Sequence, residues 1–302
     1  MTKTITRVAC GSLILATVAA TANAMPLQFR ETEPAVGARQ SNTYHGPGSG
    51  ARGQGQNVAT ESGISSDSSA PGNVPAWKVD QEVMQVREGS TEFIIRIENI
   101  AQYDSMVFSD GSSQAAGMSH GVYAIHPEGW PVYEPGEETM SATGLEALAE
   151  DGNVRPMQSF LETHPDVLES GIFYKPVGWE TDGELWPGDV YEVRFSADPG
   201  DKLSLATMLM QSNDLIYGPK DGRLELFDSN GRPVRGDISA MFDLYDAGTE
   251  ANEDPKFGPN VGLNQKGLNT GLPESEPVRL VDDGFAYPSA PQVLRITIEP
   301  AG

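Results

Sequence analysis

The chain has 302 residues with 20 basic and 43 acidic side chains, and its formal net charge at pH 7 is −23. A surface with this much negative charge repels nucleic acids and anionic lipid headgroups. Both are therefore disfavoured as partners unless cations intervene. The single cysteine, Cys10, lies near the start of the chain. The rest of the sequence can therefore form neither a disulfide nor a cysteine-based metal site.

The first residues have the three parts of a signal peptide, in the usual order. Lys3 and Arg7 give a positive start, residues 9–20 are mainly apolar, and residues 22–24 read Ala-Asn-Ala. This order predicts cleavage after Ala24 and a secreted or periplasmic protein. The alternative is a membrane anchor, but the apolar run is shorter than the roughly 20 residues that span a bilayer, so we expect no transmembrane segment.

Residues 25–75 are poor in side chains that could build a core. The stretch from 37 to 75 is rich in Gly, Ser, Asn and Ala and has few large apolar residues. Such a segment cannot bury enough surface to offset the entropy that is lost on ordering. We therefore expect a signal peptide at 1–24, a disordered Gly/Ser-rich tether at 25–75 and one folded domain at 76–302.

Apolar and polar side chains alternate repeatedly in the expected domain. Phe93, Ile95 and Ile97 share one face of a predicted strand, with Ile94, Arg96 and Glu98 on the other, and the same pattern recurs at residues 191–195, 203–210, 238–245 and 294–298. Alternation with a period of two is typical of strands that bury one face. Turn dipeptides such as Asp-Gly separate these segments. The sequence therefore predicts an all-β fold, built as an antiparallel β-sandwich.

One short helical insertion interrupts the strands, over about residues 143–163. Ser141 or Thr143 is placed to cap a first helix, which should end near Gly152. A second helix follows with Pro156 in its first turn, where the missing N–H of proline costs nothing.

Acidic residues gather where two of the predicted strands run into loops. Asp214 follows the 203–210 strand, and Asp246 and Glu250 follow a later strand. The loops of a sandwich meet at its rims, and Gly248 allows a sharp turn that lets both of its acidic neighbours face one point. Carboxylate oxygens in such loops suit Ca²⁺, which takes about six to eight oxygen ligands. The alternative is that the aspartates only cap turns, because Asp readily hydrogen-bonds its own backbone.

A series of motifs in and around these loops resembles the spondin N-terminal domain in its bacterial form. In chain order the motifs are residues 144–152 (GLEALAEDG), 204–208 (SLATM), 212–214 (SND), 226–228 (LFD), 236–237 (GD) and 246–250 (DAGTE). The resemblance runs from about Thr91 to the last predicted strand, and the block from 204 to 250 is its most specific part. It implies a C2-like β-sandwich that binds one calcium ion.

The resemblance also implies which residues hold the ion. The family's ligands fall on Asp214, Asp246 and Glu250 of this sequence. The animal motif ends in Asp, whereas this chain has Glu250, whose longer side chain could shift the geometry or bind through both oxygens. The thrombospondin-type repeats of the animal proteins are missing from this sequence, so their matrix and adhesion roles do not transfer to it.

Together these features predict an exported calcium-binding module without catalytic activity. Its partner would be an extracellular or envelope ligand, either a protein or a glycan. The alternatives are a metal-dependent hydrolase of the envelope or secreted space, and a purely structural exported protein. The sequence has no G-x-S-x-G elbow or comparable arrangement of nucleophile and base, which disfavours the hydrolase.

Two other groups of residues are weaker candidates for a functional site. His120 and His126 would share one face of a strand, so a copper or zinc site with two histidines is an alternative use of this segment. Glu146 and Glu150 are four residues apart on the first predicted helix, a spacing that usually marks a solvated face.

Overall fold

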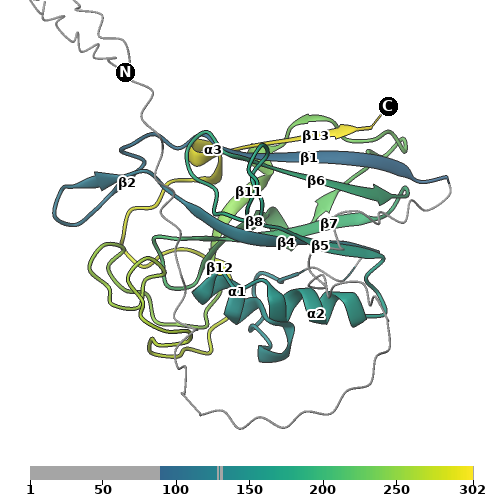
Figure 1. Cartoon of the computed structure of the whole chain (residues 1–302). Helices are drawn as coiled ribbons and strands as arrows, with labels where there is room; N and C mark the ends of the chain where they lie inside the picture. The colour runs from purple at the N-terminus through teal and green to yellow at the C-terminus, as the bar shows by residue number, and fades with distance from the viewer. Residues whose placement is uncertain (1–88, 128, 130–131, 302) are drawn as a thin grey trace, which may run out of the picture. The chain divides into compact units, whose positions relative to one another are not determined.

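A computed structural model describes residues 89–127, 129 and 132–301 of the chain (Figure 1). The predicted signal peptide at 1–24 and the predicted tether at 25–75 lie outside the described residues, as does the start of the predicted domain. Among the described residues, every helix is too short or too polar to cross a membrane.

Two antiparallel sheets form the framework of the domain. The smaller sheet has the strand order β10 (Gly236–Asp237), β13 (Leu294–Pro300), β1 (Thr91–Asn99), β6 (Val190–Ala197). The larger sheet has the order β12 (Arg279–Leu280), β11 (Phe242–Asp246), β8 (Leu215–Pro219), β7 (Lys202–Leu209), β4 (Met118–His126), β5 (Glu169–Phe173), and β9 (Leu224–Glu225) pairs with β7. A separate hairpin joins β2 (Met106–Val107) to β3 (Ser113–Gln114). The predicted all-β sandwich is confirmed.

The main core lies between the two sheets and follows the predicted alternation. On β1, Phe93, Ile95 and Ile97 are fully buried, and Ile95 pairs with Val193 of β6 on one side and Ile298 of β13 on the other. These side chains meet residues of β4, β7, β8 and β11 in one apolar cluster. The period-two pattern therefore identified β1, β6 and β13 and also their buried faces.

A second core lies on the other face of the larger sheet, where two helices pack (Figure 1). The helices are α1 (Leu145–Asp151) and α2 (Arg155–Thr163), and they bury Leu148 and Met157 against Ala206 and Ile216 of the sheet. Because both of its faces are covered, all eight residues of β7 are buried. The sequence suggested one buried face for this strand, and the structure adds the other.

The helical insertion begins differently from the prediction. Residues Ser141–Thr143 form a 3₁₀ turn, and neither Ser141 nor Thr143 is the N-cap of α1. That position belongs to Gly144, whose φ of 84° favours glycine and where a Cβ would lie 2.4 Å from the Met157 nitrogen. The predicted end at Gly152 is confirmed, with a φ of 64° and a hydrogen bond to the Leu148 carbonyl.

The predicted strand at 238–245 is wrong in its first half. Residues Ser239–Met241 form a 3₁₀ turn, and β11 begins only at Phe242. The reason is local, because the Asp237 carboxylate accepts hydrogen bonds from the backbone N–H and the hydroxyl of Ser239, at 2.9 and 2.6 Å. Such side-chain bonds compete with strand pairing.

A long irregular loop, residues 247–278, connects β11 to β12 and folds back on its own beginning. Within it, the Glu274 N–H donates to the Thr249 carbonyl at 2.8 Å and the Glu276 N–H donates to the Gly248 carbonyl at 3.0 Å. The return of this loop buries the segment that carries the predicted calcium ligands. Shorter elements complete the chain, namely a 3₁₀ turn at Lys220–Gly222 and α3 (Ala290–Val293).

Candidate metal centre

Strand pairing brings the two predicted acidic loops together. Asp214 directly precedes β8 and Asp246 is the last residue of β11, and these strands pair with Asp246 opposite Leu215. The Ala247 N–H then donates to the Asp214 carbonyl oxygen at 3.1 Å. All three predicted ligands are buried, with exposed fractions of 0% for Asp214, 1% for Asp246 and 3% for Glu250.

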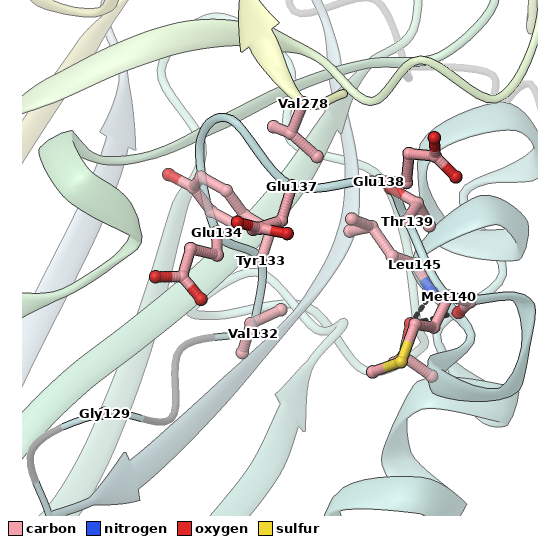
Figure 2. Close-up of a pocket in the computed structure, with 11 residues that line it drawn as sticks. Gly129, Val132, Tyr133, Glu134, Glu137, Glu138, Thr139, Met140, Leu145 and Val278 are labelled. Carbon is pink, nitrogen blue, oxygen red and sulfur yellow. Dashed lines mark hydrogen bonds between the residues drawn. The ribbon is translucent and has the colours of Figure 1, made fainter. Parts of the chain in front are cut away.

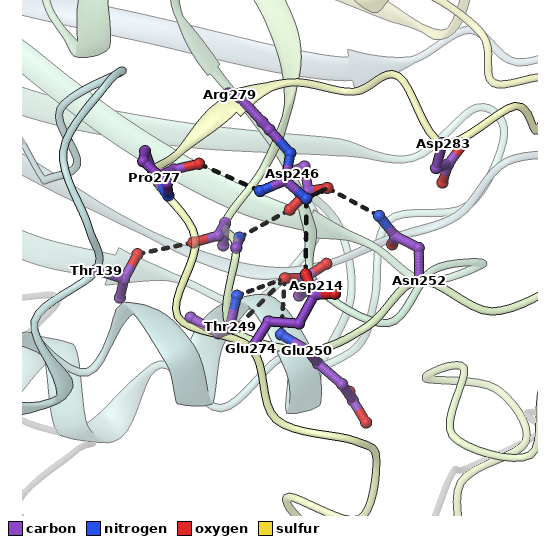
Figure 3. Close-up of polar contacts among 12 residues, drawn as sticks. Thr139, Asp214, Asp246, Thr249, Glu250, Asn252, Glu274, Pro277, Arg279 and Asp283 are labelled. Carbon is purple, nitrogen blue, oxygen red and sulfur yellow. Dashed lines mark hydrogen bonds and ion pairs between the residues drawn. The ribbon is translucent and has the colours of Figure 1, made fainter.

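The Asp214 carboxylate connects the loop before β8 to the loop after β11 through hydrogen bonds (Figure 3). Its Oδ2 accepts hydrogen bonds from the backbone N–H groups of Thr249 and Glu250, at 2.9 and 3.1 Å. Its Oδ1 is buried and has no hydrogen-bond partner. One oxygen therefore organises the loop, and the other accepts no hydrogen bond from the residues that the structure describes.

Asp246 has partners for both of its oxygens. Oδ1 accepts the Gly248 N–H at 2.8 Å, and Oδ2 accepts the Asn252 amide at 2.8 Å and an Arg279 guanidinium nitrogen at 2.9 Å (Figure 3). The tight turn after it depends on Gly248, which has a φ of 68° and where a Cβ would lie 2.1 Å from the Glu276 carbonyl oxygen. Asp246 is thus the predicted ligand whose charge is already compensated.

Glu250 extends beneath the returning loop. Its Oε1 is buried without a hydrogen-bond partner. The oxygen lies so near the backbone of Gly271 that a Cβ at this glycine would fall 1.0 Å from it. The longer side chain of glutamate is therefore accommodated here by a residue without a side chain.

The carboxylates of this cluster hold their protons unusually tightly. Burial and the neighbouring charge of Asp246 raise the pKa of Asp214 from 3.8 to about 7. Burial and the charges of Glu150 and Asp214 raise the pKa of Glu250 from 4.5 to about 8. Burial likewise raises the pKa of Glu150 from 4.5 to about 7. Loss of these protons leaves buried like charges that a cation would neutralise.

Three contributors to the cluster were missed by the sequence analysis. Glu150 was predicted on a solvated helix face, but only 3% of it is exposed, because the 247–278 loop covers that end of α1. The position of Glu150 within the 144–152 motif was the sequence signal that could have placed it in the cluster. Asn252 and Arg279 had no local signal, since Arg279 reaches Asp246 only through the pairing of β12 with β11.

The predicted alternative of a two-histidine metal site is not supported by the geometry. His126 uses both ring nitrogens, with Nδ1 2.7 Å from the Pro127 carbonyl oxygen and Nε2 2.8 Å from the Ser204 hydroxyl. No nitrogen of His126 is free to join His120 on a metal.

A separate cavity of about 260 Å³ is shown in Figure 2. Apolar side chains of Val132, Leu145 and Val278 line it, together with three glutamates, Glu134, Glu137 and Glu138. Thr139 in its wall donates a hydrogen bond to the Ala247 carbonyl at 2.9 Å, which joins the wall to the loop after β11. The cavity could accept an apolar group that carries a positive charge.

The donor chemistry of the acidic cluster fits calcium, although the ligands are not gathered around one point. Within the described part of the chain, no group of three or more His, Cys, Asp and Glu side chains is arranged to hold a metal ion. Among the described residues, three buried acceptor oxygens nevertheless make no hydrogen bond, on Asp214, Glu250 and Asn252, and the buried Asn213 amide nitrogen near Glu250 makes none either. The three oxygens are hard ligands of the kind that Ca²⁺ binds. Arg279 competes with a cation for Asp246.

Neither a protein-family model nor a curated protein matches this chain. The resemblance to the spondin N-terminal domain therefore stays a prediction that depends on the sequence motifs.

Proposed function

We propose that this chain is an exported calcium-binding β-sandwich module, which binds a partner and catalyses no reaction. The observation that carries the proposal is the set of buried oxygens without donors on Asp214, Glu250 and Asn252. Buried acceptors normally have partners, and leaving one unsatisfied costs about 1–3 kcal/mol. A cation bound by Asp214 and Glu250 would remove this cost at their two oxygens and also the repulsion between the carboxylates.

The ligands come from both sides of the paired strands. Asp214 would bind through Oδ1, and its Oδ2 would continue to hold the loop. Glu250 would bind through Oε1. Asp246 would join by exchanging Arg279 for the ion, and Arg279 would keep Glu274, whose carboxylate is 3.6 Å away. Calcium accepts such an irregular set, whereas Mg²⁺ demands octahedral geometry and gives up water reluctantly.

In this proposal the role of the ion is structural. It joins the loop before β8 to the loop after β11, and through the backbone contacts of the second loop it orders residues 247–278. Export follows from the predicted signal peptide, and the environment outside the cytoplasm supplies calcium. We place the chain in the spondin N-terminal family on its motifs, with an envelope or extracellular protein or glycan as the partner.

Calorimetric titration of the mature protein with Ca²⁺ tests the proposal. We expect one equivalent to bind to the natural sequence and none to Asp214→Asn, which keeps the shape of the side chain and removes its charge. Asp243→Asn is the matched control, since Asp243 lies on β11 but is paired with Lys220. Equal calcium binding by both variants would overturn the assignment of the site, and no binding by the natural protein would overturn the proposed function.

A further inference from the structure

A second cavity, of about 210 Å³, contains a donor set of a different chemistry. It is lined by His120, Met208 and Met210, with Asp151 and Glu184 also in its wall. None of the predicted calcium ligands lines it. Two thioethers and one imidazole around one cavity are soft donors, unlike the hard oxygens of the acidic cluster.

An irregularity in β4 sets His120 opposite these methionines. The register of β4 on β7 passes from Met118 opposite Leu209 to Gly121 opposite Thr207, so Ser119 and His120 together face Met208. The Ser119 hydroxyl accepts the Met208 N–H at 3.1 Å, which fixes the irregularity. Bulges of this kind commonly re-aim a side chain beside a functional site.

The imidazole of His120 has one nitrogen without a partner. Nε2 is buried and makes no hydrogen bond. The backbone of Gly183 lies near the ring. A buried imidazole nitrogen that makes no hydrogen bond can bind a metal ion.

The two methionines lie on the same side of their strand, two residues apart. Met208 is 2% exposed, and its sulfur would lie 3.9 Å from a Cβ on Gly152 and 3.7 Å from a Cβ on Gly262. Two glycines therefore leave room around this thioether. The Met210 N–H donates to the Gly117 carbonyl at 2.9 Å, which continues the strand pairing past the end of β7 and keeps the alternation.

We propose that His120 Nε2 and the sulfur atoms of Met208 and Met210 bind one copper(I) ion. Imidazole and thioether ligands suit this soft cation, whereas thioethers are poor ligands for Mg²⁺ and Ca²⁺. Asp151 and Glu184 give the cavity a negative potential that attracts a cation. Methionines also fill gaps in ordinary cores, but gap-filling leaves the buried Nε2 atom of His120 without a partner, and a bound metal gives it one.

The test is a titration of the mature, calcium-loaded protein with copper(I), under anaerobic reducing conditions and against a chromophoric copper(I) chelator. We expect one equivalent to bind, and we expect Met208→Leu and Met210→Leu each to weaken binding at least tenfold. Leucine conserves the volume of methionine, so the fold should persist. Met241→Leu is the control, because Met241 is 41% exposed and lies outside the cavity.

Two results would overturn the copper site. One is unchanged affinity in both Met208→Leu and Met210→Leu, and the other is the absence of stoichiometric binding to the natural protein. Should a variant melt early, X-ray absorption of the copper-loaded natural protein decides, since sulfur scattering is expected and a shell of only nitrogen and oxygen refutes the proposal. Asp214→Asn should bind copper normally, so failure of the calcium site is distinguishable from failure of this one.

Discussion

Removal of the charge on Asp214 should stabilise the calcium-free protein, although it removes a predicted ligand. The pKa of this carboxyl is raised from 3.8 to about 7, so the folded state binds its proton more tightly than the unfolded state does. The contribution to stability is therefore most favourable at low pH and declines as the pH rises from 3.8 to about 7. At about 1.4 kcal/mol for each pKa unit, the difference corresponds to about 4 kcal/mol at pH 8.

Urea unfolding of chelator-treated protein at pH 5 and pH 8 measures this effect. We expect the natural protein to lose stability between these pH values, and Asp214→Asn to lose less because its amide does not titrate. The advantage of the variant should increase from below 2 kcal/mol at pH 5 to about 4 kcal/mol at pH 8. At pH 8, calcium at a hundredfold excess over Kd should stabilise the natural protein by ~2.7 kcal/mol and leave Asp214→Asn unchanged, which narrows the advantage of the variant to about 1 kcal/mol.

Two outcomes would refute this reasoning. A calcium-free natural protein of constant stability from pH 5 to pH 8 would mean that neither burial nor the charge of Asp246 raises the pKa of Asp214. A variant less stable than the natural protein at pH 8 would mean that Asp214 acts mainly through the hydrogen bonds that it accepts from the second loop.

Three further predictions concern the same loops and the start of the chain. Gly271→Ala should weaken calcium binding at least tenfold, because the new Cβ would collide with Glu250 Oε1, whereas Gly267→Ala should be neutral because its Cβ would approach only Thr270 Cγ2, at 3.4 Å; equal calorimetric affinities would contradict this. Asp246→Ala should abolish the calcium-dependent rise in melting temperature, and a rise that persists in calorimetric scans would exclude this carboxylate as a ligand. N-terminal sequencing of exported material should begin at residue 25, and a start at residue 1 would refute cleavage.

The strands were predictable where one physical rule dominates. Alternation with a period of two identified β1, β6, β7 and β13, because each buries at least one face in the core between the sheets. The rule was incomplete for β7, since the sequence does not indicate that helices cover its other face. It failed at 239–241, where the Asp237 carboxylate diverts the backbone into a turn.

The candidate site was predictable only in part, because some of its contacts join residues that are far apart in the sequence. The acidic motifs lie next to strand ends, so they could be recognised from neighbouring residues in the sequence. The pairing of β8 with β11 brings the two loops together, as expected. The burial of Glu150 depends on the 247–278 loop, and the position of Arg279 depends on the pairing of β12. Neither contact leaves a pattern within a short window of sequence.

The pairing of β1 with β13 has a consequence for how the protein acquires its structure. These strands are about 200 residues apart in sequence, yet they are neighbours from Phe93 opposite Pro300 to Asn99 opposite Leu294. β13 also lies between β1 and β10, inside the smaller sheet. The smaller sheet is therefore complete only when β13 has joined it. Pairing between strands so far apart in the sequence makes folding slow. Slow completion of this sheet would favour the proposed export, because a chain that is threaded across a membrane must pass through before it folds.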